Sequence, residues 1–249
     1  MDLMGKTAIV TGGSGVLGGR ICAALADAGV NLAVGYATSK DRAAVVAEEM
    51  RALGVGAIAV PCDVTDLDQV VGAVDAANQE FGSVDILIND GAYNKSIEFS
   101  DLDSLTYEDW EKLLDINLSG PFRTIKEVAK PMKESGGGRI VNISSVAGLS
   151  PHGSSIAYAV AKAGLNHLTK CMARALAPDI LVNCIAPGYL EGTLMSSVLT
   201  EEHRTSAVSG AVLQRAADKD DLARQVVEFC RTDSITGQTL VIDSGRVFH

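Results

Sequence analysis

The chain has 249 residues, of which 47% are hydrophobic and 21% charged, with a formal net charge of -10. This composition is globular, and the negative charge disfavours nucleic acid and anionic membranes as partners, whereas a helix amino end can still bind a phosphate group. No apolar run is long enough for a membrane span, and the early Asp2 does not suit a signal peptide, so we expect a cytoplasmic protein.

Short β-branched runs alternate with amphipathic stretches along the chain. Most of the runs are continuously apolar, which is typical of parallel strands covered by helices on both faces. The candidate strands are 7–11, 31–36, 57–62, 84–89, 139–144, 180–186 and 239–243. Between the first four, we predict helices over 16–29, 39–54 and 65–82, with Ser39 and Thr65 as caps and Gly29 and Gly54 as stops. The pattern predicts a single doubly wound α/β domain over residues 1–249.

A glycine-rich turn follows the first strand. In "TGGSGVLGG" (11–19), Gly13, Gly15 and Gly18 satisfy GxGxxG and lead into the first predicted helix. Glycines allow a tight turn and a close backbone approach to a pyrophosphate, and the helix amino end offers free N–H groups. The turn therefore predicts a dinucleotide site.

The second strand indicates which dinucleotide binds. Dinucleotide folds often place an acid at its end to bind the adenosine ribose, but Tyr36 and Ala37 stand there. Nothing would then repel a 2′-phosphate, so we favour NADP over NAD. The groups that could bind this phosphate are those of Thr38, Ser39, Lys40 and Arg42. Asp63, just past the third strand, suits either the adenine amino group or the cap of the next helix.

Two helix positions in "AYAVAKAG" (157–164) suggest proton chemistry. Tyr158 and Lys162 are four residues apart and share a helix face. A nearby ammonium lowers the pKa of a phenol, which brings an acid with a pKa near 10 toward the working pH. Ser145 follows a strand, where α/β sites form, and Asn117 interrupts a predicted helix with an amide.

The segment 189–215 fits the alternation worst. It is either a lid over a binding site or a pair of short surface helices. Five scattered cysteines without CxxC spacing indicate buried free thiols, and we predict no metal site. These are Cys22, Cys62, Cys171, Cys184 and Cys230.

In this order and spacing, the motifs resemble the short-chain dehydrogenase/reductase family, short type, across essentially the whole chain. The residues that carry the resemblance are Thr11 to Gly18, Asp63, "NDGA" (89–92), Asn117, Ser145, "YAVAK" (158–162), Asn183, "PG" (187–188) and "TGQTLVID" (236–243). The resemblance implies a Rossmann-like, seven-stranded parallel sheet between two helix layers. It also implies hydride transfer between a nicotinamide and a carbonyl or secondary alcohol.

The same resemblance assigns residues to roles. Asn117, Ser145, Tyr158 and Lys162 match the catalytic tetrad, with Tyr158 as general acid and base and Asn117 as the anchor of a proton-relay water. The implied cofactor residues are Gly12, Ser14, Gly15, Val16, Leu17, Gly18, Tyr36, Ala37, Thr38, Ser39, Asp63, Val64, Asn89, Gly91, Tyr158, Lys162, Pro187, Gly188 and Thr193. A homotetramer, paired through helices over 107–133 and 155–177, is expected from the family.

The segment 189–215 and a few residues elsewhere in the chain predict the substrate class and the residues that bind it. An apolar inner face predicts a ketone or secondary alcohol with an apolar part; it would consist of Leu190, Leu194, Met195, Val198 and Leu199. The candidate substrate residues are Tyr93, Asn94, Ser145, His152, Tyr158, Tyr189, Leu190 and Met195, although His152 also suits an exposed loop. The alternatives are 3-oxoacyl-(acyl-carrier-protein) reduction and a nucleotide-binding module without turnover.

Several positions depart from the family pattern. "NDGA" stands where Asn-Asn-Ala-Gly is usual, and "DSG" (243–245) replaces Asp-Gly-Gly. The turn reads TGxxGxxG, with Val16 at the usual glycine of the short type. No basic residue lies in the glycine turn, where many NADP-dependent members have one.

Overall fold

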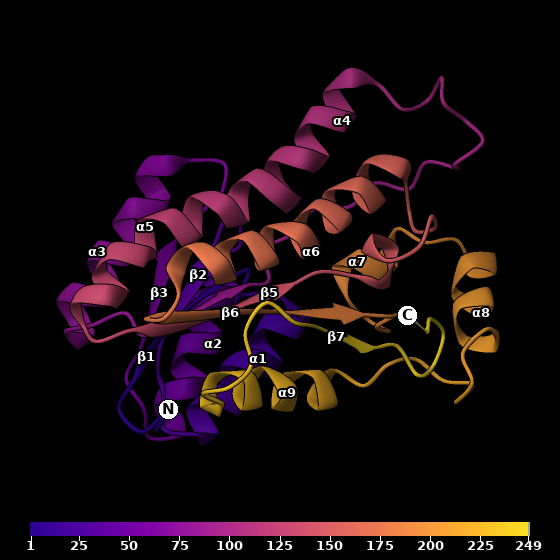
Figure 1. The fold of residues 1–249 in the computed structure, drawn as a ribbon. Helices are drawn as coiled ribbons and strands as arrows, with labels where there is room; N and C mark the ends of the chain where they lie inside the picture. Colours follow the sequence, from indigo (N-terminus) through magenta and orange to yellow (C-terminus); the bar gives the residue numbers. More distant parts are fainter. Residues whose placement is uncertain (249) are drawn as a thin grey trace.

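The structure, a computed structural model that describes residues 1–248, is built on one seven-stranded parallel sheet (Figure 1). The strand order is β3-β2-β1-β4-β5-β6-β7. The strands are β1 (Thr7–Thr11), β2 (Asn31–Tyr36), β3 (Ala57–Pro61), β4 (Ile86–Asn89), β5 (Gly138–Ile143), β6 (Ile180–Pro187) and β7 (Thr239–Ile242). All seven predicted strands are confirmed: β1 and β2 have the predicted bounds, and the ends of the others shift by at most two residues.

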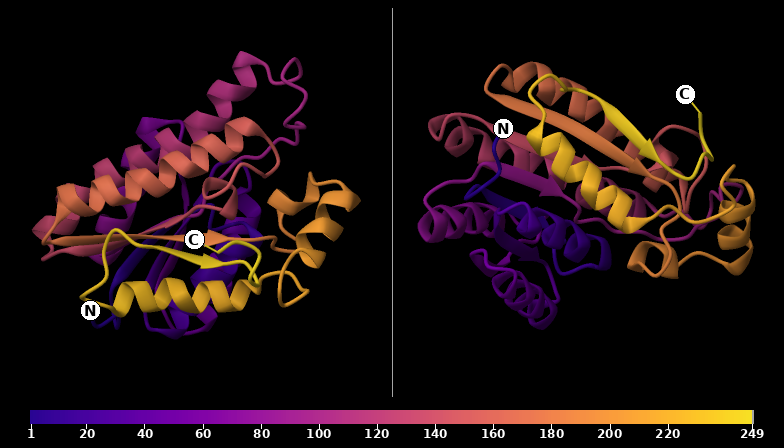
Figure 2. Two further views of the ribbon diagram at one scale, coloured as in Figure 1. Left: turned by 45° about the vertical axis from the view of Figure 1, so that its right-hand side comes forward. Right: turned by 90° about the horizontal axis from the view of Figure 1, so that it is seen from below.

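Helices cover both faces of this sheet (Figures 1 and 2). One layer consists of α1 (Val16–Asp27), α2 (Lys40–Ala52) and α9 (Lys219–Arg231). The other consists of α3 (Leu67–Phe81), α5 (Gly120–Glu134) and α6 (Ile156–Leu176). The doubly wound α/β fold predicted from the sequence is confirmed.

Two core clusters explain why the strands are continuously apolar. Neighbouring residues of a strand point to opposite faces, so Ile9 and Leu87 pack under α3 and α5. Val10 and Ile88 instead pack against α1 and α9. All four side chains are buried, and each face removes a full layer of apolar surface from water.

Helix boundaries follow local capping chemistry. The expected stops hold, because Gly29 and Gly54 have φ of 82° and 95°, a region that glycine adopts without strain. The expected cap of α3 is wrong: Asp66, not Thr65, accepts from the backbone amides of Asp68 and Gln69. Ser39 occupies the cap position of α2, but its side chain makes no capping bond.

The predicted helix over 107–133 contains a break in its regular winding. It consists of α4 (Tyr107–Leu114), a π-helical turn (Asp115–Ser119) and α5. Asn117, which sequence analysis marked as a polar interruption, lies in that turn. Single π-turns within α-helices frequently occur at functional sites.

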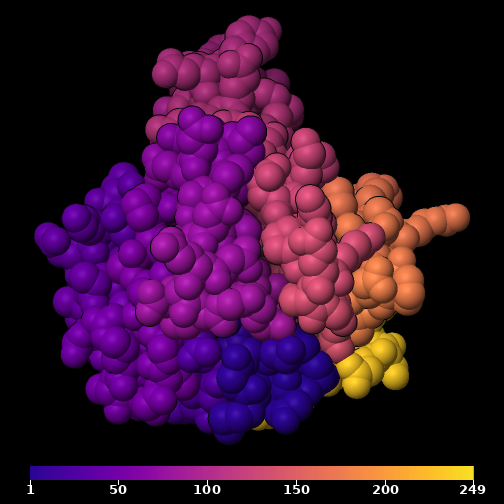
Figure 3. Space-filling view, turned by 90° about the vertical axis from the view of Figure 1, so that its left-hand side faces the viewer, coloured from indigo at the N-terminus to yellow at the C-terminus, as the bar shows by residue number. Residues whose placement is uncertain are grey.

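The segment 189–215 contains two short helices, α7 (Leu194–Ser197) and α8 (Glu201–Ser209). In the ribbon views it lies apart from the sheet layers (Figure 2), and in the space-filling view it lies at the edge of the molecule (Figure 3). No residue of α8 is buried. The second alternative, short surface helices, therefore describes its secondary structure correctly.

The predictions about the cysteines and about membrane spans can also be compared with the structure. Four of the five thiols are buried, but Cys171 is exposed, which corrects the prediction for that residue. Within residues 1–248, no helix combines the length and apolar character needed to cross a membrane. No cluster of potential metal ligands occurs over the same residues.

Candidate active site

A cavity of about 830 Å³ opens at the carboxyl edge of the sheet. It lies where the strand order reverses, between β1 and β4, the point at which open α/β sheets bind ligands. Its walls come from the glycine turn, the β4 and β5 ends, α6 and the segment 189–215. The fold therefore brings residues from distant parts of the sequence into one cleft.

Close backbone packing accounts for the glycines of the turn. Gly12 has φ of 68°, and a Cβ there would lie 2.9 Å from the Gly91 Cα atom. A Cβ on Gly18 would lie 2.3 Å from the Gly12 carbonyl oxygen. Gly18 itself does not line the cavity, so it serves the packing of α1 against the turn. Larger residues at these positions would push the turn and strand ends apart.

The start of α1 fits a pyrophosphate. Gly15 is its N-cap and offers no capping side chain, and its first turn contains no acidic residue. Free N–H groups and the positive end of the helix dipole therefore face the cavity beside Ser14 and Leu17. This is the donor set that a dinucleotide phosphate needs.

Tyr158, Lys162 and Ser145 line the same cavity. The Lys162 ammonium donates to the Ile143 carbonyl (2.9 Å) and lies 5.6 Å from the centroid of the Tyr158 ring. The Ser144 hydroxyl bonds the Lys162 carbonyl at 3.1 Å, which fixes α6 to the end of β5. The phenol and the amine thus face one space, as their spacing predicts.

The protonation of the pair differs from the expectation. Burial raises the pKa of Tyr158 to about 12, against the opposing effect of the Ser145 hydroxyl. Burial also lowers the pKa of Lys162 to about 8. The prediction that Lys162 lowers the tyrosine pKa toward neutrality is wrong for this structure, because desolvation dominates and the ammonium points to a backbone carbonyl.

Asn117 is fully buried and does not line the cavity. Its amide donates to the carbonyls of Tyr93 (2.8 Å) and Leu113 (2.9 Å), and its oxygen accepts from the Tyr93 amide. The side chain therefore holds the loop after β4 against the π-turn. Both polar atoms of the Asn117 side chain are used in these bonds, and two of the bonds fix the backbone of Tyr93.

Asn89 also lies outside the cavity lining, contrary to the expectation of a cofactor contact. Its oxygen accepts from the Thr124 hydroxyl (2.7 Å) and its amide donates to Asn142 (2.9 Å). Asn142 in turn donates to the Thr169 hydroxyl (2.9 Å). This buried chain joins α5, β4, β5 and α6 beneath the site, so Asn89 is part of its support.

Comparison with known proteins agrees with this geometry. The family model described as short chain dehydrogenase matches residues 6–204. The chain belongs to the short-chain dehydrogenase/reductase family. It is 35% identical over 246 residues to the 3-oxoacyl-[acyl-carrier-protein] reductase FabG of Staphylococcus epidermidis, covering 97% of this chain and 99% of that one. An uncharacterized oxidoreductase of Methylorubrum extorquens is 37% identical over 98% of both chains.

A solved structure gives the same result. A short chain dehydrogenase from Burkholderia cenocepacia, crystallised in complex with NADP, superposes with a TM-score of 0.90 at 33% identity and covers 99% of both chains. The protein is therefore an oxidoreductase of the short-chain dehydrogenase/reductase family that uses a nicotinamide cofactor and acts on CH–OH or C=O groups.

Five residues expected at the adenosine end of a dinucleotide line this cleft: Ala37, Thr38, Ser39, Asp63 and Val64. Tyr36, although expected as a cofactor contact, does not line the cavity. The Asp63 carboxylate accepts from the Thr65 amide (2.9 Å) and hydroxyl (2.7 Å), so it shapes the turn before α3. Since Asp66 caps that helix, the cap interpretation of Asp63 is wrong.

Other residues predicted to bind the cofactor or the substrate also line the cavity. The predicted cofactor residues among them are Gly12, Gly15, Val16, Gly91, Pro187, Gly188 and Thr193. The predicted substrate residues are Tyr93, Asn94, His152, Tyr189, Leu190 and Met195, of which His152 is exposed. Thr193 also caps α7 by accepting from the Ser196 amide. Val198 is 41% exposed and outside the lining, so it is not part of the apolar inner face.

Several cavity residues escaped sequence analysis. Lys112 of α4 lies 4.5 Å from the centroid of the Tyr93 ring, and His203 of α8 lies 3.8 Å from Glu98. Arg246 reaches the cavity from the segment after β7. No local motif marks these residues, because only the folded chain brings them together. Asp90 also lines the cavity. In this case the sequence does give a signal, because "NDGA" departs from the usual Asn-Asn-Ala-Gly at this position.

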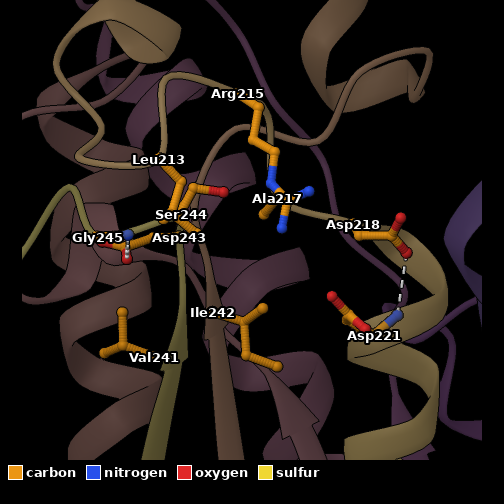
Figure 4. A pocket seen from close by; sticks show the side chains of 10 residues that line it. All are labelled: Leu213, Arg215, Ala217, Asp218, Asp221, Val241, Ile242, Asp243, Ser244 and Gly245. Carbon is orange, nitrogen blue, oxygen red and sulfur yellow. Dashed lines mark hydrogen bonds between the residues drawn. The ribbon is translucent and has the colours of Figure 1, made fainter.

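A smaller cavity of about 250 Å³ lies beside β7 (Figure 4). The Arg215 side chain points toward it from the loop before α9, while Asp218 and Asp221 lie on the helix side. It contains none of the tetrad residues. The dehydrogenase chemistry therefore belongs to the large cleft.

Proposed function

We propose that this enzyme reduces ketones to secondary alcohols, and performs the reverse reaction, with Tyr158 as the proton carrier. The observation that carries the proposal is that Tyr158, Lys162 and Ser145 face the same cavity as the glycine turn. A bound nicotinamide supplies or accepts the hydride. The chain's own residues hold the carbonyl, move the proton and keep water out.

Each side chain has a distinct role in this proposal. Tyr158 is protonated at neutral pH, which is the state needed to donate a proton to the developing alkoxide. The Ser145 hydroxyl donates a hydrogen bond to the same oxygen as charge develops there. The Lys162 ammonium stabilises negative charge on the phenol after proton transfer and offers donors to a ribose.

We propose NADP as the preferred cofactor. Ala37 and Thr38 line the adenosine end without a carboxylate that would repel a 2′-phosphate. The Ser39 hydroxyl makes no capping bond at the start of α2, so it is available to a phosphate together with the helix amino end. The relative that binds NADP supports this preference.

The substrate class is a ketone with an apolar part. Leu190 and Met195 line the cavity from one side, and Phe99 and Ile116 from the other. A second candidate is a 3-oxoacyl thioester, as in the Staphylococcus epidermidis FabG to which the chain is 35% identical. A long acyl chain suits the same apolar walls.

A turnover assay tests the function directly. Loss of NADPH absorbance is followed with a panel of ketones, acetoacetyl-CoA and 3-oxoacyl-(acyl-carrier-protein), and NADH is compared in parallel. We expect turnover on at least one carbonyl compound and its loss in Tyr158→Phe. Tight NADPH binding without turnover of any ketone or alcohol would favour a nucleotide-binding module instead.

We further propose that residues 1–249 act as one catalytic domain with the segment 189–215 as a substrate cover. The Asn94 amide donates to the Met195 carbonyl (3.1 Å), which joins this segment to the loop after β4 across the cavity. Homotetramer formation through α4, α5 and α6 is supported by exposed Phe122 and Val160 on those helices. Light scattering after gel filtration tests it.

A further inference from the structure

The Asp243 carboxylate fixes the loop that follows β7. Its two oxygens accept from the backbone amides of Gly245 (2.9 Å) and Val247 (2.6 Å), so the turn that contains Arg246 is held from inside. Gly188 fits closely against the same aspartate, because a Cβ on Gly188 would lie 2.7 Å from the Asp243 Cβ. The loop is thereby anchored beside the end of β6, where Gly188 lines the cleft.

The end of the cover holds this loop from the other side. The Leu213 amide donates to the Ser244 carbonyl (3.0 Å), and the Ser244 hydroxyl donates to the Ala216 carbonyl (3.2 Å). Figure 4 shows Leu213 and Ser244 side by side. Within residues 1–248, the non-glycine residues with positive φ are Gln214 (50°) and Ser244 (58°), one on each side of this contact. Backbone strain of this kind persists only where the surrounding bonds enforce it, and it clusters at functional sites.

Arg246, which the loop carries, lines the large cleft and is partly buried. A guanidinium is always charged, and a buried charge is normally paired. Over residues 1–248, each of the other arginines that is buried or partly buried has a carboxylate within 4 Å; these are Arg123, Arg139 and Arg204. Arg246 has no such partner among the same residues, so its cation is available to a ligand.

Arg246 lies on the substrate side of the cleft. The pyrophosphate is expected at the start of α1, directly after β1, whereas Arg246 follows β7, which is four strand spacings away in the sheet. At the strand ends this separation is about 19 Å. The chain after β7 instead turns beside the part of the molecule that contains α7 and α8 (Figures 1 and 2). The guanidinium is therefore placed for the substrate rather than for the cofactor phosphates.

We propose that Arg246 is a substrate-binding residue that recognises a carboxylate, so that the enzyme prefers ketones that carry an acidic group beyond their apolar part. The inference rests on the proposed function, because it concerns the substrate of the same cleft. A planar guanidinium bonds both oxygens of a carboxylate, and the pairing is stronger in a partly desolvated site than in water. One arginine matches the single charge of a carboxylate, whereas a phosphate carries up to about two charges.

The acidic groups of the protein do not compete for this position. The carboxylates that line the cleft belong to Asp63, Asp90 and Glu98, and none of them pairs with Arg246. The other cation of the substrate region, Lys112, lies over the Tyr93 ring. A substrate carboxylate would therefore meet one unpaired cation whose backbone is already fixed, which keeps the cost of ordering low.

Matched acids and esters test the preference by steady-state kinetics. The probes are 4-oxo-4-phenylbutanoate and 5-oxo-5-phenylpentanoate with their methyl esters, which keep the ketone and the apolar part but lack the charge. We expect the wild type to favour at least one acid over its ester in kcat/KM. Arg246→Gln should lower this acid-to-ester ratio by about tenfold or more. Arg246→Lys should retain part of the preference, because it keeps the charge without the bidentate geometry.

Arg215→Gln is the matched control. It removes an exposed arginine that lines the smaller cavity beside β7 and not the cleft, so the acid-to-ester ratio should stay within about twofold of the wild type. Esters used as well as both acids by the wild type would overturn the inference, and this comparison needs no variant. An equal loss for acid and ester in Arg246→Gln, together with weaker NADPH binding, would show that the guanidinium serves the cofactor instead.

Failure of the proposed function is distinguishable from failure of this inference. If no ketone or alcohol is turned over, the proposed function fails, and calorimetry of the same probes with the NADP-loaded protein still decides about Arg246. Tighter binding of an acid than of its ester, lost in Arg246→Gln, supports the carboxylate site. Acids that bind no more tightly than their esters overturn it.

Discussion

The floor of the cleft and its cover are built in different ways. In the floor, Tyr158 and Lys162 are buried on a 21-residue helix, and Asn89 joins four elements through buried hydrogen bonds. In the cover, α8 has no buried residue and is joined to the rest by contacts such as His203 with Glu98. Buried networks of this kind are rigid, whereas exposed contacts open at little cost in free energy.

The difference assigns separate tasks to the two regions. Proton transfer requires fixed distances, which the floor provides through packing on both sides of the sheet. Substrate entry requires a wall that can move, and we propose that the cover, whose helix α8 has no buried residue, provides it. We therefore expect substitutions in the floor to change turnover or stability, and substitutions in the cover to change mainly substrate affinity.

Tyr158→Phe tests the floor most severely. The ring and its packing remain, but the proton carrier is lost, so kcat should fall by about 10³-fold. Cofactor affinity should change by less than threefold, because the substitution leaves the glycine turn intact. Stopped-flow hydride transfer and NADPH fluorescence titration measure the two quantities. A variant that keeps a tenth of the wild-type turnover would show that another group supplies the proton.

Asn89→Ala tests whether the floor is a buried network. The substitution removes the acceptor of the Thr124 hydroxyl and the donor to the Asn142 side-chain oxygen, and we expect a loss of about 2–3 kcal/mol in the free energy of unfolding. The matched substitution in the cover is Ser206→Ala on α8, which should change it by less than about 0.5 kcal/mol. Urea denaturation provides both values. Equal losses would contradict the division into floor and cover.

The features that depend on near neighbours in the sequence were the ones predicted best. Continuous apolar strands, a glycine turn after the first of them and the spacing of Tyr158 and Lys162 all depend on near neighbours, and they predicted the fold and the shared cleft. The cap of α3 was misassigned because Thr65 and Asp66 are adjacent and both are good caps, and only the folded backbone selects one.

The remaining errors concern properties that arise only in the folded chain. Asn89 belongs to a support network because Thr124 and Asn142 come from other elements. The pKa of Tyr158 is raised because burial exceeds the effect of its neighbours, and burial is not encoded in the four-residue spacing. Arg246 enters the cavity only because β7 completes the sheet at its edge.

Ala37→Asp tests the cofactor preference of the cleft. The new carboxylate would stand at the end of β2 in the adenosine part of the cleft, where it repels a 2′-phosphate and can accept from ribose hydroxyls. We expect the ratio of kcat/KM for NADPH over NADH to fall by at least about tenfold. Steady-state kinetics with both cofactors measures it. Ala37→Asn, which has the same size without the charge, is the control and should shift the ratio much less.

Glu98→Gln tests the cover with the smallest expected effect. The Glu98 carboxylate lies 3.8 Å from the His203 imidazole, and both residues line the cavity, so their contact joins α8 to the loop after β4. An exposed pair of this kind contributes at most about 1 kcal/mol. We therefore expect KM for the carbonyl substrate to rise by no more than about fivefold, while kcat changes less than twofold. Glu202→Gln on the same helix removes an exposed charge outside the cavity and should leave both constants unchanged. Because the floor alone positions the reacting groups in this view, a large loss of kcat in Glu98→Gln would mean that closure of the cover completes the catalytic geometry.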